Sequence, residues 1–295
     1  MALQNILQTQ SGFFIGPLYI YYYGLVYAIA AIAFYLVLLR QRKKIGLSEN
    51  SIDTLLISVL AGLIIGGRVF HFLINDPSIF VTNPLELFRI RDGGMAFFGA
   101  LIGILAGIGI WYRIQQKNAL RLKNGGVSTL QIFAVLDIGC LVGSVALIFG
   151  RLANFLNQEL VGRLADPTTA PWCVNFATAP GCRHPYQLYA AAAQLVLAAV
   201  LFVLLWRSER INIRAGTIFF SFLTGYGILR FITDFWRADP IFALGLTAWQ
   251  FFALGLAIVG GYFLIRHLRS PSLSEQEQLH YTPAKSTNVK SRKHR

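Results

Sequence analysis

The chain has 295 residues, of which 55% are hydrophobic and only 13% are charged, and its mean hydropathy of +0.56 excludes an ordinary soluble domain. The formal net charge is +13 at pH 7, yet no soluble basic domain is present to carry it, so no nucleic-acid partner is expected. The sequence shows no cluster of metal-ligand residues, and we expect neither a metal nor a soluble cofactor.

Seven apolar runs, each close to the roughly 20 residues that cross a bilayer, follow one another along the chain. They lie at 18–39, 54–75, 95–113, 129–149, 187–206, 215–236 and 247–266. In lipid such runs must be helices, because each backbone polar group has to be satisfied within its own segment. The sequence therefore predicts an all-α polytopic membrane protein. Residues 1–269 are expected to form a single helical membrane domain, and residues 270–295 a polar, disordered cytoplasmic tail.

Basic residues orient these spans. Groups of them fall after the first, third, fifth and seventh runs, at 40–44, at 113–123, at 207–214 and from Arg266 onward, and these groups include all seven lysines. If the spans alternate, all four groups lie on one side, and the excess of Lys and Arg marks that side as cytoplasmic. We therefore expect the N-terminus outside and the C-terminus inside.

The remaining cations are eight arginines within spans or on the outward side: Arg68, Arg89, Arg91, Arg151, Arg163, Arg183, Arg230 and Arg237. A charged side chain costs about 3 kcal/mol at a bilayer centre, and intramembrane charges usually mark functional sites. Three outward polar segments, at 83–103, 150–189 and 225–240, carry all of them except Arg68. We expect the site there.

The segment GRLANFLNQELVG (150–162) follows one of the most apolar stretches of the chain. On a helix, Arg151, Asn154 and Gln158 share one face, with Glu159 to one side if the helix persists that far. An arginine beside amides can bind a phosphate or an ester, because the planar guanidinium donates to two oxygens at once. The alternative is a helix C-cap with interhelical hydrogen bonds, which leaves Arg151 and Glu159 unexplained.

The segment YGILRFITDFWR (226–237) places Tyr226, Arg230 and Asp234 four residues apart, so they stack along one helix face, with Arg237 three residues further on. A self-contained Arg230–Asp234 pair is the alternative to a binding site, and it leaves Arg237 unexplained.

Two features of the outward loop before the fifth run stay open. Cys173 and Cys182 are equally compatible with a disulfide and with two reduced thiols. His184 precedes Pro185 at a loop-to-helix entry, where a structural and a catalytic role have similar support.

These same residues resemble the signature of the prolipoprotein diacylglyceryl transferase family, Gly-Arg-x-x-Asn-Phe-x-Asn-x-Glu-x-x-Gly. Further similarity follows in family order, in YYYGLVYA, GGRVFHFL (66–73), RDGGMAFFGALIG (91–103), RHPYQLY (183–189) and GYGILRFITDFWR (225–237). The resemblance covers residues 18 to 266 and implies a seven-helix enzyme of the bacterial inner membrane. Such enzymes move the diacylglyceryl group of phosphatidylglycerol to the lipobox cysteine of a prolipoprotein, at the outer face, and release glycerol phosphate.

The resemblance also implies roles for single residues. Arg151 and Arg230 would clamp the phosphate and stabilise the charge that develops on it. The other implied substrate-binding positions are Asn154, Glu159, Gly162, Tyr23, Tyr226, Asp234, Gly93, Gly94 and Gly99.

The chain departs from the family pattern at three positions. Phe98 stands where the family has a histidine that is a candidate base for the thiol, Ala190 replaces a glutamate after QLY, and Asp234 replaces a glutamate. Either another group activates the thiol, with Glu159 and His184 the nearest ionisable candidates, or turnover is weakened. The rival hypotheses are a divergent paralogue that binds anionic lipid or lipoprotein precursors without turnover, and a transporter, which no broken-helix repeat supports.

Overall fold

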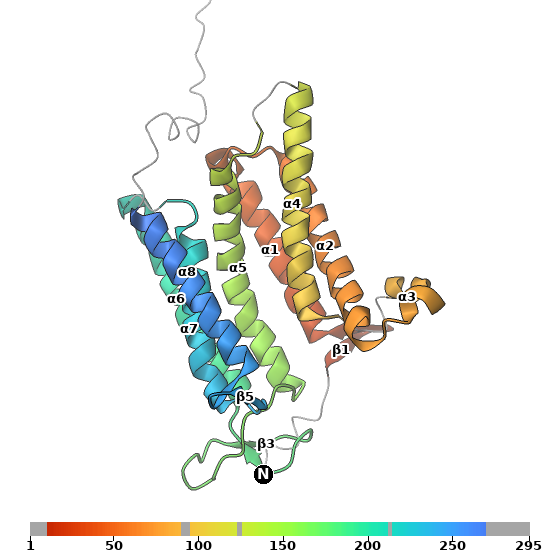
Figure 1. The fold of residues 1–295 in the computed structure, drawn as a ribbon, viewed down its shortest axis with the longest axis vertical. Coiled ribbons are helices and arrows are strands. Elements are labelled where there is room, and N and C mark those ends of the chain that lie inside the picture. The colour runs from red at the N-terminus through yellow and green to blue at the C-terminus, as the bar shows by residue number, and fades with distance from the viewer. Residues whose placement is uncertain (1–10, 90–94, 123–125, 212–213, 270–295) are drawn as a thin grey trace, which may run out of the picture. The chain divides into compact units, whose positions relative to one another are not determined.

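The computed structural model describes residues 11–89, 95–122, 126–211 and 214–269, which leaves the tail at 270–295 outside the described residues. Seven long helices follow the seven predicted runs (Figure 1): α1 (Tyr22–Ile45), α2 (Glu49–Asn75), α4 (Phe97–Leu122), α5 (Thr129–Leu156), α6 (Tyr186–Ile211), α7 (Thr217–Thr233) and α8 (Ala248–Arg269). The expectation of an all-α polytopic membrane protein is confirmed.

Short elements connect these helices. They are the short helix α3 (Ile79–Thr82), the 3-10 helices η1 (Pro84–Phe88) and η3 (Asp234–Trp236), and three antiparallel hairpins: β1 (Gly12–Ile15) with β2 (Leu18–Tyr21), β3 (Val174–Asn175) with β4 (Cys182–Arg183), and β5 (Ile241–Ala243) with β6 (Leu246–Thr247). Each hairpin is a local turn between neighbouring segments, so the long helices provide the body of the fold.

Six of the described helices are long and apolar enough to cross a membrane, namely α1, α2, α5, α6, α7 and α8. Helix α4 is not among them, so the number of spans and the direction of the termini stay predictions.

The first predicted run is wrong at its beginning. Residues 18–21 form strand β2, and the helix starts only at Tyr22. Gly16, whose φ is +58°, turns the chain together with Pro17, so that Leu18 pairs with Ile15. An apolar run contains no signal that separates a strand of this kind from the helix that follows it.

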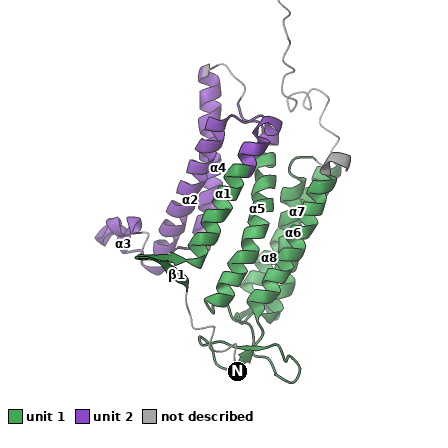
Figure 2. Cartoon of the chain, turned by 180° about the vertical axis from the view of Figure 1, so that it is seen from behind, with its two compact units in different colours: residues 1–36, 132–272 green, residues 37–131, 273–295 purple. Residues whose placement is uncertain are grey.

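The chain divides into two compact units (Figure 2), residues 1–36 with 132–272 and residues 37–131 with 273–295.

The second unit is held together by a close approach of α2 and α4. A Cβ at Gly99 would lie 2.2 Å from the Gly66 carbonyl oxygen, and one at Gly103 would lie 1.9 Å from that of Gly62. Glycine is therefore required where the two backbones meet, as in other closely packed membrane helices.

In the first unit, α5, α6, α7 and α8 lie side by side, with the β3–β4 and β5–β6 hairpins at one end (Figure 1). At the other end, Asp137 of α5 caps α7. Its carboxylate accepts hydrogen bonds from the backbone N–H groups of Gly216 and Phe219, both at 2.7 Å. The first turn of a helix has no internal partners for these N–H groups, and a carboxylate also complements the positive end of the helix dipole.

Replacing Asp137 with alanine should lower the free energy of unfolding by about 2 kcal/mol or more, because two charge-assisted hydrogen bonds at a helix start are lost. Thermal unfolding of the purified protein in detergent measures this loss. Ser144→Ala is the matched control on α5, since the buried Ser144 hydroxyl donates only to Leu141 of its own helix. Equal unfolding temperatures for the two variants would contradict the capping role.

Candidate active site

The end of α5 differs from the sequence prediction. The helix stops at Leu156, and Gln158 adopts a left-handed conformation with φ of +55°. The buried Gln158 side chain therefore does not share a face with Arg151 and Asn154. It accepts the backbone N–H of Ala177 at 2.5 Å and thereby holds the loop between Cys173 and Cys182.

Glu159 lies beyond the helix and becomes the acceptor of a small network. Its Oε2 accepts from the Tyr23 hydroxyl at 2.7 Å and from Asn154 Nδ2 at 3.3 Å, while its Oε1 accepts from Asn157 Nδ2 at 3.3 Å. Asn154 also donates to the Tyr23 hydroxyl oxygen, and its own Oδ1 accepts from Arg151 Nη1 at 3.2 Å. The Asn154 amide thus connects the arginine to the carboxylate, and the first helix is tied to the segment 150–162.

Arg151 carries a charge that no described carboxylate neutralises by an ion pair, since its recorded side-chain partner is the Asn154 amide oxygen. The charge of Arg151 acts on three tyrosine hydroxyls, those of Tyr23, Tyr27 and Tyr186. A cation at the end of a membrane helix with no anionic partner among the described residues is a candidate position for an anion.

A second polar cluster lies where α7 ends in η3. Arg230 Nε forms an ion pair with Asp234 Oδ2 at 2.9 Å, and Asp234 is completely buried directly after the last residue of α7. This is the local pair that the sequence leaves open as the alternative to a binding site. The Tyr186 hydroxyl donates to Asp234 Oδ1 at 2.7 Å. Arg237 pairs with Asp239 at 3.0 Å and lies over the Tyr186 ring at 5.7 Å, so its charge has a local explanation.

Tyr186 is the common neighbour of the two clusters. The charges of Arg151 and Arg230 both act on its hydroxyl, and its side chain is fully buried at the first position of α6. Because Asp234 occupies only the Nε side of Arg230, the two Nη groups keep most of the donors of that guanidinium. The charges of both arginines therefore reach the same buried phenol.

Asp239, outside the spans, extends the same charge pattern. Burial raises the pKa of its carboxyl above the usual value, and the positive charge of Arg237 acts in the opposite direction. The ion pair with Arg237 therefore offsets part of the cost of burying the Asp239 carboxylate at this end of the bundle.

Gly162 joins the two parts of the site through close backbone packing. It forms an isolated antiparallel bridge with Arg237, and its carbonyl accepts from Arg183 Nη1 at 3.1 Å. A Cβ at this position would lie 2.2 Å from the His184 carbonyl oxygen and 2.9 Å from that of Trp236. Only glycine fits between the backbone at His184 and the backbone at Trp236.

The Cys173–Cys182 pair forms a disulfide across the β3–β4 hairpin, with a Cα–Cα distance of 5.4 Å. This settles the alternative that the sequence leaves open. The closed loop is bound to the segment 150–162 through Gln158, which also accepts the Thr178 hydroxyl on its backbone oxygen at 2.7 Å. The disulfide therefore stiffens a loop that contacts the turn carrying Glu159.

Replacing Cys173 and Cys182 together with serine should cost about 2–3 kcal/mol of stability, because the nine-residue separation closes a short loop in the unfolded chain. Thermal unfolding with and without reductant measures the effect, and reductant should shift the parent protein but not the double variant. Cys140→Ala removes the free thiol of α5 and should show the parent's response. Titration of three free thiols in the native protein would contradict the disulfide.

His184 lies in the loop that packs on Gly162. Its Nδ1 is 3.1 Å from the Tyr189 hydroxyl, which accepts the indole N–H of Trp172 at 2.6 Å. The indole can only donate, so the arrangement is satisfied when Tyr189 donates to Nδ1 and Nε2 carries the ring proton. In this tautomer His184 offers a donor at Nε2.

The other predicted site residues lie elsewhere. The Tyr226 ring stacks on that of Phe222, with 5.7 Å between the ring centroids, and packs against an apolar cluster. Its hydroxyl also interacts electrostatically with Arg230. Gly99 lies in the second unit at the α2–α4 contact described above. Gly93 and Gly94 lie outside the described residues, and so does the side chain of Phe98, which occupies the first turn of α4.

Sequence reasoning missed Tyr186 and Gln187. Gln187 is fully buried and donates to the Glu159 backbone carbonyl at 2.5 Å. The signal was present in the segment 183–189, where polar residues begin a helix that is otherwise apolar, but only His184 was selected from it. Amide and phenol groups at the start of a membrane helix need partners, and this need could have identified both.

Fold and site together define a polytopic helical membrane protein with arginines, amides and tyrosine hydroxyls at one end of its helices. Comparison with known proteins is consistent with that class. The chain matches the sequence profile of the prolipoprotein diacylglyceryl transferases over residues 10–266 and belongs to this family.

Curated relatives share the similarity over most of their length. The chain is 37% identical to the phosphatidylglycerol–prolipoprotein diacylglyceryl transferase of Geobacter sulfurreducens, over 81% of this chain and 85% of the relative. It is 36% identical to the Janthinobacterium sp. (strain Marseille) protein of the same name, over 85% and 92%. The corresponding protein of Dechloromonas aromatica is 33% identical, over 88% and 96%.

Proposed function

We propose that this protein transfers the diacylglyceryl group of phosphatidylglycerol to the lipobox cysteine thiol of a prolipoprotein, as the names of its relatives state for them. The observation that carries the proposal is Arg151, a cation at the end of α5 with an amide partner and no ion pair to a described carboxylate. A phosphodiester supplies the missing negative charge. No nucleic acid takes part.

The reaction needs one bond to form and one to break. The thiolate sulfur attacks the glyceryl carbon that carries the phosphate oxygen, and the carbon–oxygen bond breaks with its electron pair going to the phosphate. Glycerol phosphate leaves with one more negative charge than the phosphodiester had. Arg151 and the Nη groups of Arg230 stabilise this additional charge, which is larger in the transition state than in the bound lipid.

The neighbouring residues position these two arginines. Asp234 and Tyr186 fix Arg230, while Asn154, held by Tyr23 and Glu159, fixes Arg151. Gly162 allows the segment 150–162 to pack closely against the backbone at His184 and Trp236. The thiol proton goes to a nearby acceptor. Of the two ionisable groups named from the sequence, Glu159 is the candidate, because His184 in the tautomer described above offers a donor at Nε2.

We place the protein in the bacterial inner membrane, with this site toward the outer side. The disulfide supports that orientation, since disulfides persist in oxidising compartments and the hairpin lies at the site's end of the bundle. The lysines and most arginines belong to the opposite loops, in agreement with the distribution of charge in membrane proteins.

A direct assay tests the proposal. Purified full-length protein is incubated with phosphatidylglycerol and a lipobox peptide, and the peptide is analysed by mass spectrometry. We expect a thioether-linked diacylglyceryl adduct on the cysteine, and none on a Cys→Ser peptide. Binding of phosphatidylglycerol without any adduct would reject the catalytic assignment.

Phe98 favours a second candidate, a paralogue that binds lipid or a lipoprotein precursor with weak turnover or none, because phenylalanine cannot accept a proton. Phe98→His separates the two. If the base was lost, the histidine raises turnover, and if another group serves as the base, turnover stays within about twofold. A thiol with a pKa near 8.5 is partly ionised near neutral pH, so measurable transfer does not require a histidine at this position.

A further inference from the structure

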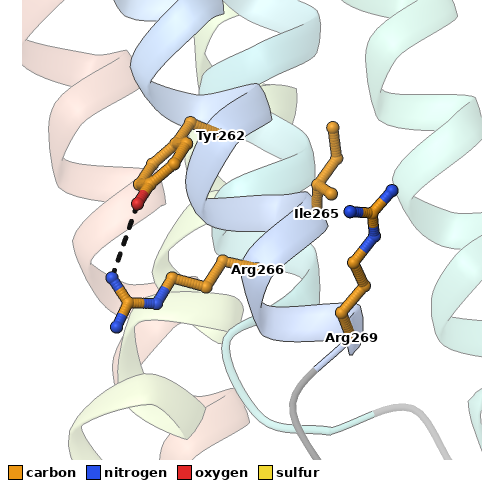
Figure 3. A pocket seen from close by; sticks show the side chains of 4 residues that line it. All are labelled: Tyr262, Ile265, Arg266 and Arg269. Atoms are coloured by element: carbon orange, nitrogen blue, oxygen red, sulfur yellow. Dashed lines mark hydrogen bonds between the residues drawn. The ribbon is translucent and has the colours of Figure 1, made fainter.

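The far end of α8 carries a pocket of about 400 Å³ that the diacylglyceryl transfer does not use. Its lining residues are Tyr262, Ile265, Arg266 and Arg269 (Figure 3). Their spacing of three, four and seven residues places them in one stripe along the helix. Because α8 begins beside the β5–β6 hairpin, the pocket lies at the opposite end of this unit from Arg151 and Arg230 (Figure 1).

The polar groups of this pocket select an anion with several acceptor oxygens. Arg266 Nη1 donates to the Tyr262 hydroxyl oxygen at 3.5 Å, so the Tyr262 O–H proton can be donated to a ligand. Arg269 lies on the other side of Ile265 in Figure 3 and forms no ion pair with a described carboxylate. The two guanidinium groups provide donors only, and the phenol adds one O–H donor, which fits phosphate oxygens.

The surface beside the pocket selects a ligand with hydrocarbon chains. Leu254, Ile258 and Ile265 continue the same helix stripe and are 39%, 62% and 52% exposed. This part of α8 is apolar enough to cross a membrane, so the exposed side chains face acyl chains. A phosphate at Arg266 and Arg269 would therefore have its lipid tails along Ile258.

We propose that this pocket binds the phosphate headgroup of an anionic phospholipid in the leaflet opposite to the active site. The inference is independent of the proposed transfer, because it rests on residues at the other end of the bundle. The competing explanation is that the arginines only mark the cytoplasmic side. A topology signal requires only positive charge on that side of the membrane. A headgroup site requires the guanidinium groups of Arg266 and Arg269 at these positions on α8.

Native mass spectrometry of the full-length protein in detergent, titrated with phosphatidylglycerol or phosphatidylcholine, tests the site. Arg266→Gln with Arg269→Gln should weaken retention of one phosphatidylglycerol by about 30-fold, given a factor of about five for each cation near a membrane surface. Retention of phosphatidylcholine should not change. Lys43→Gln with Lys44→Gln is the matched control, since it removes two exposed charges from the same predicted side on α1 and should change retention less than twofold.

Three results would overturn the inference. Equal weakening in the two double variants would mean general surface charge, and an unchanged affinity in Arg266→Gln with Arg269→Gln would mean no site. Displacement of the bound lipid by 10 mM inorganic phosphate would assign the pocket to a free anion. Transfer activity, measured in parallel, should stay within twofold of the parent, and a parent without transfer activity would reject the proposed function while leaving the lipid comparison valid.

Discussion

Replacing Arg151 with glutamine should lower the rate of diacylglyceryl transfer by about 100- to 1000-fold, the usual loss when one donor to a developing negative charge is removed. The reason is specific to this residue. Arg151 is bound to an amide rather than to a described carboxylate, so its charge is available to the substrate. The measurement is the rate of adduct formation on the lipobox peptide at saturating phosphatidylglycerol.

Two controls separate binding of phosphate from other effects. Arg151→Lys keeps the charge but loses the planar fork, and it should recover only part of the rate. Arg207→Gln removes an exposed arginine near the end of α6 that lies opposite Tyr186, and it should leave the rate within twofold. A rate within threefold of the parent for Arg151→Gln would refute the role of Arg151 at the phosphate.

Arg230 is a less clean probe of the same chemistry. Its removal leaves Asp234 completely buried without its cation, and breaking a buried pair in this way typically costs about 3–5 kcal/mol. Loss of activity in an Arg230 variant therefore combines lost transition-state stabilisation with a damaged structure. Among the described residues, no carboxylate forms an ion pair with Arg151, so its removal leaves no such buried charge and its variants are the better measure of catalysis.

The sequence predicts the helices well and the contacts between them poorly. Long apolar runs in lipid allow only helices, so the seven helices follow from composition. The spacing of four residues also allows the Arg230–Asp234 pair, which the sequence leaves open as the alternative to a binding site, because the two residues are close neighbours at the end of α7. In contrast, the Tyr23–Glu159 hydrogen bond joins residues 136 positions apart, and the Tyr186–Asp234 bond joins residues 48 apart. Periodicity within one segment carries no information about such pairs.

The end of α5 shows why the predicted helix face of Arg151, Asn154 and Gln158 was partly wrong. The segment after Leu156 contains no proline and no glycine before Gly162, so a helical continuation was reasonable. The helix ends because Gln158 takes a left-handed conformation and is held there by Ala177 and Thr178, which belong to the disulfide loop. This tertiary contact decides the boundary. It also moves Glu159 off the helix and toward Tyr23, where it can hold Asn154.

Replacing Gly162 with alanine should abolish more than 99% of transfer activity and destabilise the end of the bundle that carries the β3–β4 hairpin. The new Cβ would lie 2.2 Å from the His184 carbonyl oxygen, and backbone on both sides has to shift. A displaced segment moves the Arg237 bridge on one side and the turn carrying Glu159 on the other. A displacement of about 1 Å in a positioned site can cost 100-fold in rate.

Gly150→Ala is the matched control, twelve residues earlier in the same segment, since no described atom outside its own helix lies within 4 Å of a Cβ there. This substitution places alanine at a helix position, where it should stabilise the helix by up to about 1 kcal/mol and leave the transfer rate unchanged. Both rates come from the peptide assay, and both unfolding temperatures are measured in the same detergent. Comparable activity in the two alanine variants would mean that the contact between Gly162 and the His184 loop does not position the site, and that Arg151 and Arg230 are held without it.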